Sequence, residues 1–401
     1  MFQNSFYGRL DKKAQYIIGV SFFMFFVNGL YGMLFGSLLP ILSDKYQLDD
    51  TVSGLLVSGQ QIGNLVAGFL SGIVPLYLGL KKSVVVLGSF VIIGFIILIS
   101  GVGHAFFLFL AFFFVGISRG SVSNFTNKTV NDVSNSSPQA LNLMHAIFAI
   151  GALISPFLLT LTMANVGGEG WKLILIMIIV FIILSQIFFS KADIDVQVLP
   201  KEKRKISFEF LKDSLFWVII AILFFYMCSE AAITGWLVKF FVDTNVLVLE
   251  KAQLLSSFLW LGILIGRVYC SIVSGKMSRK RLLIGISLGM FVSFVALIYS
   301  QTTLTVILSS LALGATMGGI YPTAVTLAGV SIKQYPMAMG WILVTGGIGA
   351  TVAPTFVGVL SDHFDLFFGM QSIIIMIGLM IVSIATYIVI ERKRVISEVK
   401  I

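Results

Sequence analysis

Long apolar stretches separated by short polar breaks recur along the whole chain, and each stretch could cross about 30 Å of hydrocarbon as a helix. The bilayer core holds no water for open backbone groups, and the stretches are too long and too uniformly apolar for barrel strands. We therefore expect each stretch to be a membrane-spanning helix. The pattern predicts twelve spans, at residues 16–43, 52–78, 84–101, 105–126, 140–164, 172–190, 215–242, 253–276, 282–300, 304–329, 337–361 and 367–390.

The one long polar break, residues 191–214, divides these spans into two groups of six. We expect an N-terminal six-helix half over residues 1–190, a cytoplasmic linker over 191–214, and a C-terminal six-helix half over 215–401. The predicted fold class is an all-α membrane protein, with twelve transmembrane helices in two six-helix halves around a central cavity.

The two halves also repeat part of each other's sequence. Segment 150–156, which reads Ile-Gly-Ala and ends in Pro, recurs at 348–354 with an offset of 198 residues. The same offset carries Gly116 onto Gly314. Two six-helix halves in parallel repeat are typical of one large class of secondary transporters, whose substrate site lies between the halves.

Composition supports the bilayer as the solvent of this chain. Charged residues make up 11% of it, where a soluble globular protein carries roughly 25%. Hydrophobic residues make up 58%, more apolar surface than one soluble globule could bury. The two cysteines, Cys228 and Cys270, lie within apolar stretches, which excludes a disulfide framework and a thiolate zinc site.

The basic residues indicate which side of the membrane each loop faces. Of the 27 Lys and Arg residues, 21 lie on the side of the N-terminus, three on the opposite side (Lys45, Lys172, Lys251) and three inside spans. Because basic loops stay in the cytoplasm, we expect a multi-pass protein of the cell membrane with both termini cytoplasmic. The net charge of +9 then reflects topology and not a nucleic-acid partner. The polar start of the chain and its long first span predict an uncleaved anchor.

Charged residues inside spans are the first candidates for chemistry, because a charge in hydrocarbon is costly and faces a cavity or a partner. Glu230 and Arg267 both lie near the middle of their predicted spans. We expect Glu230 to be a protonatable coupling group whose ionisation Arg267 influences. An equally open alternative is a structural ion pair between the two that never titrates.

Arg119 is a third charged candidate, in a half with no acid inside a span. Arg119, Ser123 and Asn127 are spaced i, i+4 and i+8, so they share one face of their helix and predict a polar stripe into the cavity. Arg119 could bind an anionic substrate or reach Glu230. The alternative is that backbone carbonyls or water satisfy its guanidinium.

Neutral and aromatic side chains complete the expected substrate site. Amides and hydroxyls can bind a hydroxyl-rich ligand, although each could equally join two helices. Tryptophan rings can stack on a sugar face or anchor a span at the membrane interface. The predicted substrate-binding residues are Asn28, Tyr31, Gln61, Arg119, Ser123, Asn127, Trp236 and Trp260.

Several motifs resemble those of one transporter family. They are Tyr226-Met-Cys-Ser-Glu230 with Gly235-Trp236, Trp260-Leu-Gly262 with Gly266-Arg267, Gly318-Gly-Ile-Tyr-Pro322, and His145-Ala-Ile-Phe-Ala-Ile-Gly151 with Asn127 upstream. With the twelve spans, they resemble the major facilitator superfamily, and within it the subgroup of fucose and glucose proton symporters and sodium-linked glucose carriers. Ser123 stands where the sugar symporters carry a glutamate, so any proton step needs another residue.

The resemblance implies ion-coupled symport, with H⁺ or Na⁺, of a sugar or related polar solute by alternating access. The alternative is proton-coupled export of drug-like or other small molecules. An enzyme would need either a nucleophile with its base or a set of metal ligands, and the sequence shows no such set. A channel would need a selectivity filter, and no filter motif is visible. We expect no cofactor and no metal. The expected partners are a small-molecule substrate, a coupling ion and the lipid bilayer, and the chain is expected to be a monomer.

Overall fold

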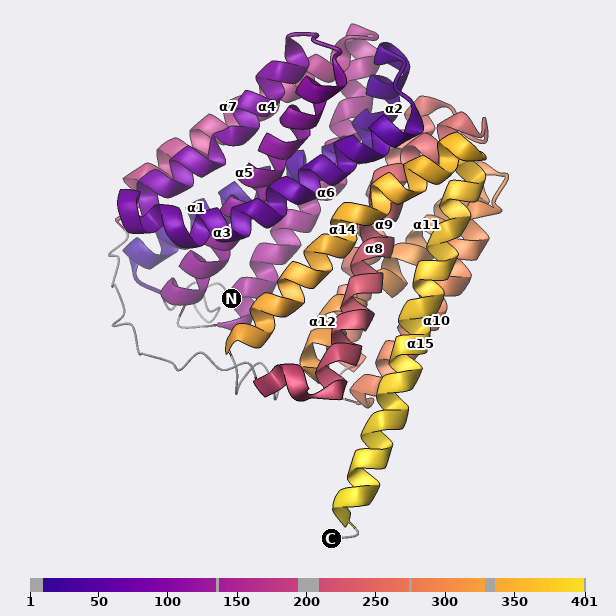
Figure 1. Ribbon diagram of the computed structural model, residues 1–401. Coiled ribbons are helices and arrows are strands. Elements are labelled where there is room, and N and C mark those ends of the chain that lie inside the picture. The colour runs from indigo at the N-terminus through magenta and orange to yellow at the C-terminus, as the bar shows by residue number, and fades with distance from the viewer. Residues whose placement is uncertain (1–9, 135–136, 194–208, 274–275, 329–335, 400–401) are drawn as a thin grey trace. The chain divides into compact units, whose positions relative to one another are not determined.

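The computed structural model describes residues 10–134, 137–193, 209–273, 276–328 and 336–399, and nearly all of them are helical (Figure 1). The chain divides into two compact units, which are described separately. The first unit comprises Met1–Leu48 and Leu55–Leu199, and the second comprises Asp49–Gly54 and Pro200–Ile401. The second unit thus includes a short segment from early in the chain.

The first unit is a helical bundle in which α1 packs against α5, α6 and α7, and α4 packs against α5. Its helices are α1 (Lys12–Gly32), α2 (Leu34–Tyr46), α3 (Asp50–Gly88, in this unit from Leu55 onward), α4 (Phe90–Ile99), α5 (Ala105–Val133), α6 (Pro138–Val166) and α7 (Gly170–Lys191). Helix α1 begins after Asp11, whose side chain accepts a hydrogen bond from the Ala14 N–H at 2.7 Å. Met24, Val84 and Phe125 bring α1, α3 and α5 into one apolar core.

Two predicted spans, 52–78 and 84–101, meet at a break in the helical backbone. Gly79 has φ 72° and ψ 166°, a conformation that interrupts the helix and that glycine adopts without steric cost. Among the described residues, eleven segments are long and apolar enough to cross a membrane, and the segment Asp50–Ile99 covers the first of these spans and all but the last two residues of the second. The prediction of an all-helical protein with twelve spans is confirmed.

In the second unit, α8 packs against α14 and α15, α9 packs against α11, and α10 packs against α11 and α15. Its elements are the 3₁₀ turn η3 (Glu209–Lys212) and helices α8 (Ser214–Asp243), α9 (Leu249–Val273), α10 (Arg279–Ile298), α11 (Thr303–Met317), α12 (Ile320–Leu327), α14 (Pro336–His363) and α15 (Leu366–Val399). Asp213 caps the start of α8 and also lies 2.6 Å from an Arg394 guanidinium nitrogen. This ion pair joins the start of α8 to the far end of α15.

Equivalent helix contacts recur in the two units. A Cβ added to Gly151 of α6 would lie 2.2 Å from the Phe26 carbonyl oxygen of α1. A Cβ added to Gly349 of α14 would lie 2.7 Å from the Phe224 carbonyl oxygen of α8. Gly349 follows Gly151 by 198 residues, and Phe224 follows Phe26 by the same number, which is the offset of the sequence repeat. The repeat is therefore one of packing contacts as well as of residue types.

Helices α9 and α11 approach so closely that a methyl group does not fit between them. A Cβ on Gly314 would lie 2.1 Å from the Leu259 carbonyl oxygen. Because such overpacking costs about 1–3 kcal/mol, we expect Gly314→Ala to lower the melting temperature of the purified protein in detergent by several degrees. Gly285→Ala is the matched control, because a Cβ there would meet no atom within 4 Å. Equal melting temperatures for the two variants would contradict this packing.

Candidate functional site

In the first unit, predicted residues from α1 and α5 meet a buried amide of α3. Asn28 is fully buried, and its Nδ2 donates to the Arg119 carbonyl at 3.0 Å. The Arg119 side chain runs past Gly32, where an added Cβ would lie 3.2 Å from its Cδ and Nε. Gln60, buried in α3, donates to the Gly32 carbonyl at 3.2 Å. The predicted Gln61 is the half-buried neighbour of this glutamine.

Tyr31 makes a hydrogen bond inside the bundle of the first unit. Its hydroxyl is buried and lies 3.1 Å from Ser118 Oγ, which itself donates to the Gly88 carbonyl at 2.9 Å. Because a serine has one O–H, Tyr31 is the donor to Ser118. The charge of Arg119 acts on the same hydroxyl. Tyr31 therefore lies near Arg119, with its own proton committed to Ser118.

The predicted polar stripe lies on one face of α5. This helix is continuous, so Arg119, Ser123 and Asn127 are aligned along it. All three residues are half-buried, and Asn127 Nδ2 donates to the Ser123 carbonyl at 2.8 Å. The stripe is thus neither sealed in the apolar core nor fully exposed, and its role in substrate binding stays a prediction.

In the second unit, Tyr226 links the two predicted coupling residues to a helix end. The Tyr226 hydroxyl is buried and donates to the Met317 carbonyl at 3.1 Å. Glu230 is in hydrogen-bonding contact with the same hydroxyl, and the charge of Arg267 acts on it. The ring of Tyr321 lies 6.5 Å from that of Tyr226, between centroids. Glu230 therefore contacts a tyrosine on whose hydroxyl the charge of Arg267 also acts, while a direct ion pair between the two stays a prediction.

Met317 is the last residue of α11, at the point where the tenth predicted span is interrupted. Gly318 and Gly319 separate α11 from α12, and Pro322 has no N–H to donate four residues back. An added Cβ on Gly318 would lie 2.4 Å from the Ile263 carbonyl oxygen of α9. Interrupted membrane helices expose backbone carbonyls at substrate and ion sites. The carbonyl of Met317, just before this break, accepts from the Tyr226 hydroxyl that Glu230 also contacts.

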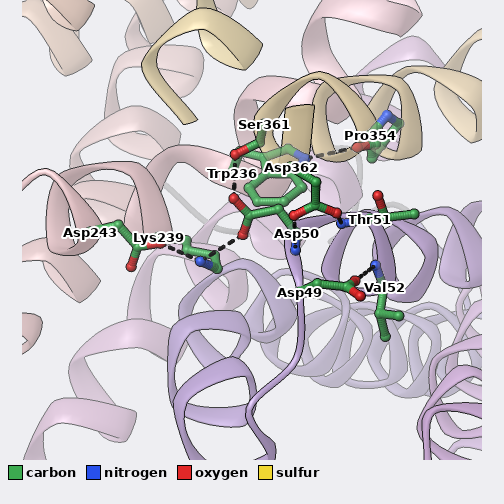
Figure 2. Close-up of polar contacts among 10 residues, drawn as sticks. All are labelled: Asp49, Asp50, Thr51, Val52, Trp236, Lys239, Asp243, Pro354, Ser361 and Asp362. Carbon is green, nitrogen blue, oxygen red and sulfur yellow. Dashed lines mark hydrogen bonds and ion pairs between the residues drawn. The ribbon is translucent and has the colours of Figure 1, made fainter. Parts of the chain in front are cut away.

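The two predicted tryptophans lie in different surroundings. Trp236 is fully buried and its Nε1 donates to the Pro354 carbonyl of α14 at 3.0 Å (Figure 2). It follows Glu230 by six residues on α8, so the two side chains leave the helix in different directions. Trp260 is also buried, and it precedes Arg267 by seven residues on one face of α9. Of the two, Trp260 shares a helix face with a predicted coupling residue.

A cluster of charged residues in the second unit was not among the predicted site residues (Figure 2). Lys239 Nζ lies 2.9 Å from Asp50 Oδ1 and also pairs with Asp243. The second carboxylate oxygen of Asp50 accepts a hydrogen bond from Ser361. The sequence signal for this cluster is Lys239 itself, a basic residue inside a predicted span with an acid four residues later. Its other partners are distant in sequence and could not be found from spacing.

Comparison with known protein families agrees with the fold and the repeat. The family model described as Major Facilitator Superfamily matches residues 21–256 and 243–399, nearly the whole chain. The chain belongs to the major facilitator superfamily. It is therefore a multi-pass membrane transporter of small molecules and not an enzyme.

Similar proteins cover almost the full length of the chain. The glucose/mannose transporter GlcP of Bacillus subtilis (strain 168) is 22% identical over 394 residues, which cover 86% of this chain and 94% of GlcP. A crystal structure of the nucleoside transporter NupG has a TM-score of 0.72 and 15% identity, covering 94% and 99% of the two chains. The Escherichia coli fucose:proton symporter FucP has a TM-score of 0.63 and 14% identity, covering 92% and 98%. At these identities the structures show a shared fold.

The hydrogen bond from Tyr226 to Met317 leads to a prediction about stability. Tyr226→Phe would leave a buried carbonyl without its donor, which costs about 1–3 kcal/mol. We expect the melting temperature of the purified protein in detergent to fall by several degrees. Tyr269→Phe, on the exposed side of α9, is the control that should leave the melting temperature unchanged. An unchanged value for Tyr226→Phe would show that this bond contributes nothing to the second unit.

Proposed function

We propose that the protein is an ion-coupled symporter, driven by H⁺ or Na⁺, of a sugar or related polar solute. It works by alternating access between the two sides of the membrane. The observation that carries this proposal is the position of Glu230, the one acid well inside a predicted span, in contact with the Tyr226 hydroxyl at the α11 break. A protonatable group inside the membrane is a typical coupling element of transporters.

The coupling step follows from the hydrogen-bonding capacity of Tyr226. Its single O–H has two acceptors within reach, the Glu230 carboxylate and the Met317 carbonyl. Hydrogen bonds to an ionised acceptor are roughly twice as strong as neutral ones. Ionised Glu230 therefore competes for the proton of Tyr226, whereas protonated Glu230 leaves it to Met317. Proton binding at Glu230 would in this way change the hydrogen bonding of the interrupted span, with Arg267 stabilising the ionised form.

Substrate binding is proposed for the polar residues identified above in each unit. In the first unit, the Asn28 Oδ1 atom accepts no hydrogen bond from any described residue, although the side chain is fully buried. The Nδ2 atom of the same amide donates to the backbone carbonyl of Arg119, the first residue of the stripe on α5. Amide and guanidinium groups are the donors and acceptors that a hydroxyl-rich solute requires. In the second unit, Trp260 precedes Arg267 by seven residues on the same face of α9, and its ring could stack on the solute.

The similarity to GlcP and FucP supports a sugar as the substrate, since their names state glucose, mannose and fucose. One observation favours a second candidate function, proton-coupled export of drug-like molecules. Ser123 replaces the glutamate of the sugar symporters, and Arg119 lies four residues from it. Resistance of cells to hydrophobic cations on expression of the protein would support export over uptake.

The proposed topology places both termini in the cytoplasm of the cell that makes the protein, with the protein in the plasma membrane as a monomer. The excess of basic residues on the side of the N-terminus supports this orientation. The ends of α2, α8 and α14, together with the start of α3, then lie on the outer side.

The test of this function uses the purified protein in liposomes and a panel of hexoses and sugar acids. We expect at least one sugar to drive proton or sodium entry and to accumulate against its gradient. Glu230→Gln should abolish accumulation while sugar exchange across the membrane continues, because binding persists without a titrating group. Glu250→Gln, an exposed acid at the start of α9, is the matched control. Full accumulation by Glu230→Gln would remove Glu230 from the coupling mechanism.

A further inference from the structure

We propose that Asp50, Lys239, Asp243, Ser361 and Asp362 form a releasable latch. They hold the first turn of α3 on the second unit and have to separate during the transport cycle. Figure 2 shows these side chains gathered around the start of α3, with Lys239 and Asp243 from α8 and Ser361 and Asp362 from α14. The latch rests on the alternating access of the proposed function, but it does not depend on the identity of the substrate or of the coupling ion.

Asp362 binds the start of α3 as a helix cap supplied by another helix. Its carboxylate accepts from the Asp50 N–H at 2.9 Å and from the Thr51 N–H at 2.7 Å. The first N–H groups of a helix have no partner within that helix and attract negative charge. Asp49, the preceding residue, caps the Val52 N–H from within the same chain segment. The start of α3 is thus capped twice, once locally and once by α14.

Lys239 is the buried charge of the latch. Its side chain is 8% exposed and contacts Asp50, 17% exposed, and Asp243, 35% exposed. A buried ammonium that loses its partner is strongly unfavourable, because the remaining charge stays out of water. Asp50 is therefore held at both ends, by Lys239 and Ser361 through its side chain and by Asp362 through its N–H. These contacts should form and break together.

The backbones of α3 and α14 also touch within the latch. A Cβ on Gly54 would lie 2.5 Å from the Pro354 carbonyl oxygen, and one on Gly358 would lie 2.2 Å from the Asp50 carbonyl oxygen. The Pro354 carbonyl is also the acceptor of the Trp236 indole. The two glycines thus allow a close fit that a small displacement removes. Such contacts are either formed or lost and do not stretch gradually.

The division of the chain shows which movement would open this contact. Residues 49–54 belong to the second unit, whereas α3 from Leu55 onward belongs to the first. Any movement of the remainder of α3 relative to the second unit must break the latch or bend α3 near Leu55. Alternating access requires the halves of a transporter to move against each other. In the proposed topology, the latch lies on the outer side and would release as that side opens.

Amide hydrogen exchange tests whether the latch acts as a unit. The full-length protein in lipid nanodiscs is compared with Lys239→Gln and Asp362→Asn, and exchange is followed at the Asp50 and Thr51 amides. Asp362→Asn alters their direct acceptor, but Lys239 contacts neither amide. We expect Lys239→Gln to accelerate their exchange by about tenfold or more, because the contacts open together. Lys251→Gln, an exposed lysine at the start of α9, should have no effect.

Two results of the exchange experiment would overturn the latch. Unchanged exchange in Lys239→Gln alongside fast exchange in Asp362→Asn would show that the contacts are independent. Unprotected Asp50 and Thr51 amides in the unmodified protein would show that the contact does not form in the bilayer. Neither result depends on transport, so a failure of the hexose assay would contradict the proposed function and leave this test intact.

A reversible cross-link tests whether release is needed for transport. D50C and S361C are introduced into a C228S/C270S background and oxidised with copper phenanthroline, which takes two electrons as the thiols lose two protons and form a disulfide. We expect uptake of whichever solute the protein carries to fall to background on oxidation and to return with dithiothreitol, and the reduced protein is the reference. A static contact predicts no inhibition, so uptake at the reduced rate after complete cross-linking would overturn the latch.

Discussion

Polar groups that are buried in hydrocarbon need partners inside the protein, and both units of this transporter are organised by that constraint. The Asn28 amide donates to the Arg119 carbonyl, the Tyr226 hydroxyl to the Met317 carbonyl, and Lys239 lies between two aspartates. The first two bonds and the Lys239 contact with Asp50 each join different helices. The bonds that desolvation demands therefore also determine which helices lie together at the candidate site.

Close backbone packing makes these short polar contacts possible. Glycines bring α1 against α6, α8 against α14 and α9 against α11, with no room for a methyl group at the crossing. Small residues allow such approach in membrane helices, where apolar side chains gain little by leaving lipid. The same 198-residue offset relates Gly151 to Gly349 and the Phe26 carbonyl to the Phe224 carbonyl. The two units therefore use the same glycine-to-carbonyl contact between equivalent helices. The polar residues of the two units differ, as Arg119 in the first and Glu230 in the second illustrate.

The spans, the repeat and the charged candidates were accessible from sequence, because each depends on local periodicity or on one residue in an apolar stretch. The stripe on α5 followed from helical spacing alone. Contacts between distant segments were not accessible: Asp362 binds the amides of Asp50 and Thr51 across more than 300 residues. Burial was also hidden from the sequence: the indole N–H of Trp236 bonds to the Pro354 carbonyl, and a role of this residue at the substrate stays a prediction.

We propose that polar residues in each unit bind a sugar or related polar solute. A thermal-shift titration of the purified protein in nanodiscs tests it directly, since a ligand that binds the folded state raises the melting temperature as its concentration increases. Hexoses, sugar acids and hydrophobic cations are titrated in parallel. The account predicts a saturable rise with at least one hexose or sugar acid. A rise with hydrophobic cations and none with any sugar would contradict it.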